Sequence, residues 1–153
     1  MPTPPDPREF KRPDSVLVVI HTPDHHVLLL HRCPPFGFWQ SVTGSLAPGE
    51  TPREAATREF AEETGLLVSA GELIDWRLTN RFPIPAQWRQ RYPPGVCHNS
   101  ESVFSLCLPA PRDVTLAPAE HDAAEWLPAA LALPRIWSWT NRDALRLCLR
   151  QPA

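Results

Sequence analysis

Short runs of apolar residues in the N-terminal third of the chain predict strands. Residues 15–21 (SVLVVIH) and 27–32 (VLLLHR) flank the turn-rich segment TPDHH, so we expect them to pair as a β-hairpin. Residues 38–43 (FWQSVT) are predicted to form a third strand that leads to Gly44. We expect further extended segments at residues 66–70, 73–80, 102–108 and 114–116.

Residues 52–64 carry the signals of a helix with both ends marked. Thr51 is a suitable N-cap, Pro52 at the first helical position costs no hydrogen bond, and Glu54 completes a capping box with Thr51. Gly65 is expected to end the helix, because glycine is free to adopt positive φ just past the last turn.

A second helix is expected near the C-terminal end of the chain. It starts near Thr140 or Asn141, and Leu145, Cys148 and Leu149 supply its apolar side at helical spacing. One central helix, one terminal helix and a mixed sheet between them predict an α/β (α+β) sandwich.

Length and composition indicate a single domain. The chain has 153 residues, of which 42% are hydrophobic and 21% charged, as is typical of one globular domain. The first thirteen residues hold five prolines and no apolar run, so residues 1–13 are predicted to be a flexible lead-in, and neither a signal peptide nor a membrane span. The domain itself is expected to cover residues 14–153.

Charge and cysteine spacing argue against several classes of site. A net charge of -2 gives no sign of a surface for nucleic-acid polymers. The cysteines form no C-x-x-C pair, which supports neither a zinc site nor a disulfide framework. We therefore expect reduced thiols in a cytoplasmic protein at Cys33, Cys97, Cys107 and Cys148.

Three glutamates of the predicted central helix are candidate metal ligands. Glu59, Glu62 and Glu63 stand at positions i, i+3 and i+4, so their carboxylates project from one helix face. Like charges at this spacing repel one another, and a hard divalent cation such as Mg²⁺ would compensate them.

The segment from Gly44 to Leu66, GSLAPGETPREAATREFAEETGL, fits the pattern G-x(5)-E-x(7)-R-E-U-x-E-E-x-G-U, in which U is a bulky aliphatic or aromatic residue. It is identified as a Nudix box. The resemblance implies the Nudix fold, a loop-helix-loop catalytic motif and metal-dependent hydrolysis of a diphosphate linked to another group. It also implies Mg²⁺ as the cofactor, with Mn²⁺ as a possible substitute.

Beyond the box, the chain resembles the bacterial dihydroneopterin triphosphate diphosphatases, the Nudix enzymes of folate biosynthesis. The pieces that carry this resemblance are WQSVTGS (39–45), RYPPGV (91–96), NSES (99–102), EH (120–121) and SWTNR (138–142). The resemblance implies hydrolysis of 7,8-dihydroneopterin triphosphate to dihydroneopterin monophosphate and pyrophosphate in the bacterial cytoplasm.

Two other functions stay open. A Nudix pyrophosphohydrolase of nucleoside triphosphates, such as dATP or oxidised dGTP, has the same box. A non-catalytic ligand-binding module is disfavoured, because such domains tend to lose box glutamates and this chain keeps Glu59, Glu62 and Glu63.

The resemblance also implies roles for individual residues. The Gly44 carbonyl, Glu59 and Glu63 would bind the metal, with Glu62 as a further ligand or as the group that activates water. Glu120 would fold back onto the same ion from far along the chain, and either Glu62 or Glu120 would remove the proton of the attacking water. The residues that hold the motif in shape would be Glu50, Arg58 and Gly65.

Substrate contacts follow from the same resemblance. They are expected at Lys11, Arg32, Thr43 and Ser138, and in a specificity segment made of Phe82, Pro83, Ile84 and Pro85. A triphosphate needs cationic partners, and Arg can bind phosphate bidentately.

Residues 76–96 are rich in arginine and aromatic residues. They either stack a planar ring while arginine meets phosphate, or cover the sheet with solvated arginines; the candidate arginines are Arg77, Arg81, Arg89 and Arg91. No sequence feature indicates a protein partner.

Overall fold

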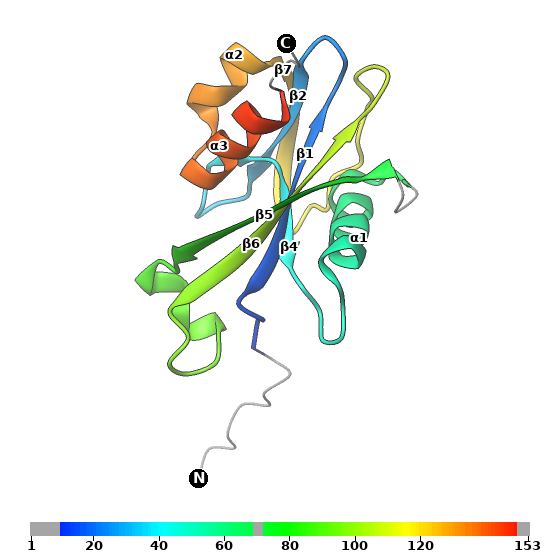
Figure 1. The fold of residues 1–153 in the computed structure, drawn as a ribbon. Coiled ribbons are helices and arrows are strands. Elements are labelled where there is room, and N and C mark those ends of the chain that lie inside the picture. The colour runs from blue at the N-terminus through cyan, green and yellow to red at the C-terminus, as the bar shows by residue number, and fades with distance from the viewer. Residues whose placement is uncertain (1–9, 69–71, 150–153) are drawn as a thin grey trace.

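The computed structural model describes residues 10–68 and 72–149. Within these residues one seven-stranded sheet lies between helices, so the predicted α+β sandwich is confirmed (Figure 1). The strands are β1 (Asp14–His21), β2 (His26–Arg32), β3 (Trp39–Gln40), β4 (Val42–Ser45), β5 (Ile74–Pro83), β6 (His98–Cys107) and β7 (His121–Pro128). The helices are α1 (Pro52–Thr64), α2 (Ala129–Ala132) and α3 (Trp139–Cys148), with 3-10 helices at Ala86–Arg91 and Leu133–Arg135.

The sheet is mixed and divides at its centre. Strand β1 pairs in parallel with β6 over its whole length, whereas the other pairs are antiparallel. The predicted hairpin of β1 and β2 forms, but the two strands pair only at His21 and Val27. Further from the turn, β1 pairs with β4, and β2 pairs with β3 and β7. The sheet therefore opens between β4 and β2.

The prediction of a single strand over residues 38–43 is wrong, because the structure has two short strands there. β3 pairs with β2 and β4 pairs with β1, so the chain crosses the opening of the sheet at Ser41. Asn141 of α3 holds this crossing: its Oδ1 accepts a hydrogen bond from the Ser41 backbone at 2.9 Å, and its Nδ2 donates one to Ser41 Oγ at 3.0 Å. Both residues are buried.

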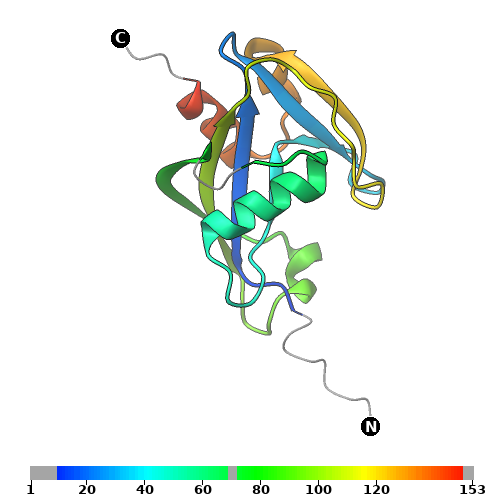
Figure 2. The same cartoon turned by 90° about the vertical axis from the view of Figure 1, so that its right-hand side faces the viewer.

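Alternate residues of β1 face two separate cores. Val16, Val18 and Ile20 pack with Phe60 on the α1 face, and Leu17 and Val19 pack on the other face with residues of α2 and α3. Figure 1 shows α1 on one side of the sheet and α2 and α3 on the other, and Figure 2 shows α1 in front of β1. Burial on both faces explains the continuous apolar run of this strand.

Helix α1 has the ends that its sequence predicts. Thr51 Oγ1 accepts from the Glu54 backbone N–H and Glu54 Oε1 accepts from the Thr51 backbone N–H, both at 3.2 Å. Gly65 adopts φ 72° and donates its backbone N–H to Ala61 at 2.9 Å. The capping box and the glycine stop are confirmed.

Several predicted strands differ from the structure. Residues 66–68 and 114–116 lie outside the strands, and residues 69 and 70 lie outside the described residues. Thr115 donates its backbone N–H to the Thr64 carbonyl at 2.8 Å, so this segment seals the C-terminal end of α1 and joins no sheet edge. The structure adds β7 and α2, extends β5 to Pro83, starts β6 at His98 and starts α3 at Trp139.

The described end of the predicted lead-in is attached to the domain. Lys11 donates its backbone N–H to the Arg91 carbonyl at 2.8 Å, and Ser100 donates its own to the Pro13 carbonyl at 2.9 Å. Arg12 bonds the carbonyls of Ala47 and Glu50. Residues 1–9 lie outside the described residues. In the part of the chain that the structure describes, no helix is long and apolar enough to span a membrane.

Candidate active site

The three box glutamates occupy different environments. Glu63 is fully buried and Glu59 is 8% exposed, whereas the Glu62 side chain is 57% exposed. Helix α1 therefore buries two of the carboxylates and leaves the third at the surface.

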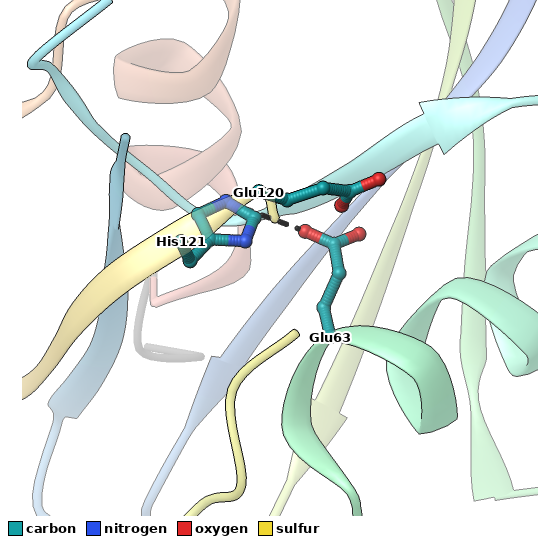
Figure 3. A group of neighbouring side chains, drawn as sticks. All are labelled: Glu63, Glu120 and His121. Carbon is teal, nitrogen blue, oxygen red and sulfur yellow. Dashed lines mark ion pairs between the residues drawn. The ribbon is translucent and has the colours of Figure 1, made fainter. Parts of the chain in front are cut away.

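Glu63 meets Glu120 and His121, the residue before β7 and its first residue. In Figure 3 the Glu63 carboxylate lies beside the Glu120 carboxylate and the His121 ring. Each of the three residues offers one potential ligand atom, and these atoms lie within 4.8 Å of one another. His121 Nε2 is 3.7 Å from Glu63 Oε1. The structure thus brings Glu120 next to the box, as the resemblance implied.

Little among the described residues offsets the charge on Glu63. Neither carboxylate oxygen has a hydrogen-bond partner among them. Burial, and then Glu59 and Glu120, raise the pKa of Glu63 well above its ordinary value. Burial also raises the pKa of Glu59, against the opposing effect of Arg58. A divalent cation would stabilise these carboxylates, so the oxygen-rich cluster fits a hard metal ion.

His121 is a neighbour of this cluster that the sequence did not single out as a ligand. Burial lowers the pKa of His121 to about 4, with a further lowering by Arg32. The ring is therefore neutral at pH 7, and its Nε2 lies 3.2 Å from Gln40 Nε2. Only its place beside Glu120 in the EH pair could have indicated it.

Arg58 ties the box together. It donates two hydrogen bonds to the Glu50 carboxylate, each at 2.8 Å, and one to the Ser45 carbonyl at 3.0 Å. It also donates to Glu59 at 2.7 Å and to Glu62 at 3.2 Å. Glu54, four residues before Arg58, instead accepts a hydrogen bond from the Thr51 backbone N–H. This geometry supports a shape-holding role for Arg58 and Glu50.

A cavity of about 760 Å³ lies beside the acidic cluster. It is lined by most of the predicted metal and substrate residues: Lys11, Arg32, Thr43, Gly44, Glu59, Phe82, Pro83, Ile84, Pro85, Glu120 and Ser138. Glu62 and Glu63 are not among its lining residues. Glu63 is fully buried, and Glu62 is exposed on the surface of α1.

Cations gather at one part of the cavity. Lys11, Arg32 and Arg91 all line it, together with Glu59 and Glu120. Burial lowers the pKa of Lys11, and Arg91 and Arg32 lower it further, whereas the two carboxylates oppose this shift. Three mutually repelling cations form a site that an anionic ligand would stabilise.

Aromatic rings form another wall. Phe38 stacks on Trp137 with ring centroids 4.6 Å apart, and Trp88 lies 5.6 Å from Trp137. The Arg32 guanidinium carbon lies 4.6 Å from the centre of the Phe36 ring. The sequence indicated only Trp88 among these rings, through its place in residues 76–96.

The arginine-rich segment 76–96 contributes only in part. Trp88 and Arg91 line the cavity, but Arg77, Arg81 and Arg89 do not. Arg89 instead donates to the Ile84 carbonyl at 3.0 Å. Trp88 and Arg91 therefore lie where a ligand could meet them, whereas Arg77 and Arg81 are exposed away from the cavity lining.

A buried polar group closes the far end of the cavity and was not predicted as part of the site. Its members are Asn99, Glu101, Thr140 and Asn141, which the sequence placed only inside the segments NSES and SWTNR. Burial raises the pKa of Glu101 to about 7.

Comparisons with known proteins agree with this arrangement. The NUDIX domain family matches residues 11–148 of the chain. The chain is 48% identical over 141 residues to the dihydroneopterin triphosphate diphosphatase of Escherichia coli, which covers 89% of this chain and 91% of the relative. It is 36% identical over 141 residues to the enzyme of the same name from Haemophilus influenzae, with 90% and 88% covered.

A solved structure shares the fold. The structure of the E. coli dihydroneopterin triphosphate pyrophosphohydrolase aligns with a TM-score of 0.83 at 45% identity, covering 90% of this chain and 95% of that chain. The resemblance identified from the box and from the segments beyond it is confirmed.

Proposed function

Because the chain belongs to the NUDIX domain family, we propose that it is a pyrophosphohydrolase that cleaves 7,8-dihydroneopterin triphosphate into dihydroneopterin monophosphate and pyrophosphate. The relatives that support this substrate cover about nine tenths of the chain. They are bacterial enzymes, and we place the activity in the bacterial cytoplasm, where folate is made.

The observation that carries this proposal is the make-up of one cavity. The cations Lys11, Arg32 and Arg91, the carboxylates of Glu59 and Glu120, and a set of aromatic rings line the same space of about 760 Å³. This volume lies within the range of pockets for small ligands. A planar ring linked to a triphosphate has parts that match each of these surfaces.

The acidic cluster is suited to the divalent metal that Nudix hydrolases use. We propose that Glu59, Glu63 and Glu120, with the Gly44 carbonyl, hold Mg²⁺, and that Mn²⁺ can replace it. When bound, such an ion polarises phosphoryl oxygens and lowers the pKa of its bound water. Glu62 is more remote, because it is exposed and paired with Arg58.

The remaining chemistry belongs to the protein's own side chains. Lys11, Arg32 and Arg91 bind the phosphate oxygens and orient the triphosphate. Glu120 lines the cavity and accepts the proton of the attacking water. The water oxygen bonds to phosphorus, the anhydride bond between the α and β phosphates breaks, and pyrophosphate leaves. Positioning and electrostatics should supply more of the acceleration than proton transfer, which typically contributes 10²–10⁴-fold.

Product analysis tests this reaction. Incubation with dihydroneopterin triphosphate and Mg²⁺ should yield pterin monophosphate and pyrophosphate in equal amounts, and a chelator should stop the reaction. Release of orthophosphate with a pterin diphosphate would contradict the proposed cleavage.

A further inference from the structure

At the far end of the cavity, two buried side chains each have one acceptor oxygen without a partner among the described residues. Glu101 and Asn99 stand at alternate positions of β6, so they point to the same face of the sheet. Both line the cavity, and they are only 6% and 5% exposed. Glu101 Oε1 and Asn99 Oδ1 have no hydrogen-bond partner among the described residues.

The surrounding residues hold these side chains in place but leave one acceptor oxygen of each without a donor. Asn99 donates its Nδ2 to Ser15 Oγ at 2.8 Å, which leaves its Oδ1 free to accept. Hydrogen bonding with Thr140 opposes the rise in the pKa of Glu101 that burial causes. Thr140 in turn lies 2.8 Å from Ser138, oxygen to oxygen. A buried acceptor without a donor is unfavourable, so this arrangement favours a ligand that supplies donors.

The position of Glu101 fits one end of a ligand whose other end reaches the box. Ser15 of β1 pairs with Ser45 of β4 on one side and with Glu101 of β6 on the other. Two strand spacings separate Ser45 from Glu101, or roughly 10 Å between backbones. A bicyclic ring can therefore contact Glu101 while the attached phosphates extend towards Gly44.

Resting on the proposed function, we propose that Glu101 and Asn99 recognise the N–H edge of a 2-amino-4-oxopyrimidine ring, as found in pterin and guanine. The Glu101 carboxylate accepts from the ring N–H and the 2-amino group, and Asn99 Oδ1 accepts a further N–H. At the same edge, adenine has a ring nitrogen that accepts hydrogen bonds. Its lone pair would face the lone pairs of the Glu101 carboxylate, and the two would repel each other. These two residues would then set the substrate class.

A kinetic comparison tests the role of Glu101. Glu101→Gln keeps the shape but turns an acceptor into a donor, so kcat/KM for dihydroneopterin triphosphate should fall roughly 10- to 100-fold, mainly through KM. The value for ATP should stay within about threefold, since no bond to adenine is lost. Glu125→Gln is the matched control, because Glu125 of β7 pairs with Arg135 and does not line the cavity. An equal fall for both substrates, or no fall for the pterin, would overturn the proposal.

Binding of free rings separates this inference from the proposed reaction. Pterin and lumazine share one ring system, but lumazine has an oxo group in place of the 2-amino group. Fluorescence titration should show that wild-type protein binds pterin at least about tenfold more tightly than lumazine, and that Glu101→Gln loses this preference.

Ring binding by the wild-type protein requires no turnover, so the inference stays testable even if Glu101→Gln fails to fold. Equal affinity of the wild-type protein for both rings would overturn it. A clear pterin preference in a protein that does not hydrolyse the pterin triphosphate would support the edge recognition and refute the proposed function.

Discussion

The Glu59 carboxyl group lies so close to Gly44 that a Cβ atom at position 44 would overlap it. The backbone of Gly44 does not adopt positive φ, so the glycine is needed for close approach and not for conformation. Through this contact, the carboxylate of α1 reaches the strand that borders the cavity. Gly44 and Glu59, both fixed positions of the box, thus pack directly against each other.

Gly44→Ala should lower activity strongly while leaving the fold intact. Its methyl group would displace the Glu59 carboxylate, and a misplacement of about 1 Å can cost 10²-fold in rate. We expect kcat/KM to fall by about that factor, with a circular dichroism spectrum like that of the wild type. Gly49→Ala is the contrasting control: its added Cβ meets no atom within 4 Å, but φ is 76°. That variant should lose stability and keep its rate.

Glu63→Gln should abolish nearly all turnover at saturating substrate. The amide cannot supply the charge that a metal ion requires, and it removes the cost of an ionised carboxylate in a fully buried place. We therefore expect equal or higher thermal stability without metal, and no gain in Tm when Mg²⁺ is added. Glu54→Gln, on the same helix, keeps the capping box and should behave as wild type. A Glu63→Gln rate above about a tenth of the wild-type rate would show that Glu63 is not a metal ligand.

Glu101 should make stability depend on pH. Burial raises the pKa of Glu101 in the folded protein to about 7, above the ordinary value of 4.5. Its contribution to stability is then fully present below pH 4.5 and is lost as the pH rises through 7. Relative to Glu101→Gln, the wild type should lose about 2–3 kcal/mol of unfolding free energy between pH 5 and pH 8. Urea unfolding at both pH values measures this difference, and a difference that does not change with pH would contradict it.

Asn141→Ala should destabilise the fold through Ser41. The substitution removes both partners of Ser41 at the crossing and leaves a buried backbone N–H without an acceptor. We expect a loss of roughly 1–3 kcal/mol in urea unfolding. Ser41→Ala keeps the backbone bond and should lose less. Equal losses would mean that the backbone bond to Asn141 does not stabilise the crossing.

Local signals explain what the sequence predicts well. The caps of α1 depend on Thr51, Glu54 and Gly65, which lie within or next to the helix that they define. The β1–β2 hairpin has its turn residues between two apolar runs. Each of these features is determined by neighbours in the chain, so the residue types alone are sufficient.

Contacts between distant residues explain what the sequence does not show. The break at Ser41 depends on Asn141, one hundred positions away. Glu101 is buried because β6 pairs with both β1 and β5 and because Thr140 lies against it. The aromatic wall joins Phe36 and Phe38 to Trp88 and Trp137. The spacing of residues along the chain does not indicate which distant residues will be in contact.

The most direct test of the proposed function compares substrates. Initial rates should be measured against concentration for dihydroneopterin triphosphate and for common nucleoside triphosphates, with Mg²⁺ and then with chelator. We expect the pterin kcat/KM to exceed that of every nucleotide at least tenfold, a difference of about 1.4 kcal/mol in transition-state binding. A nucleotide that exceeds the pterin by the same factor would contradict the assigned substrate.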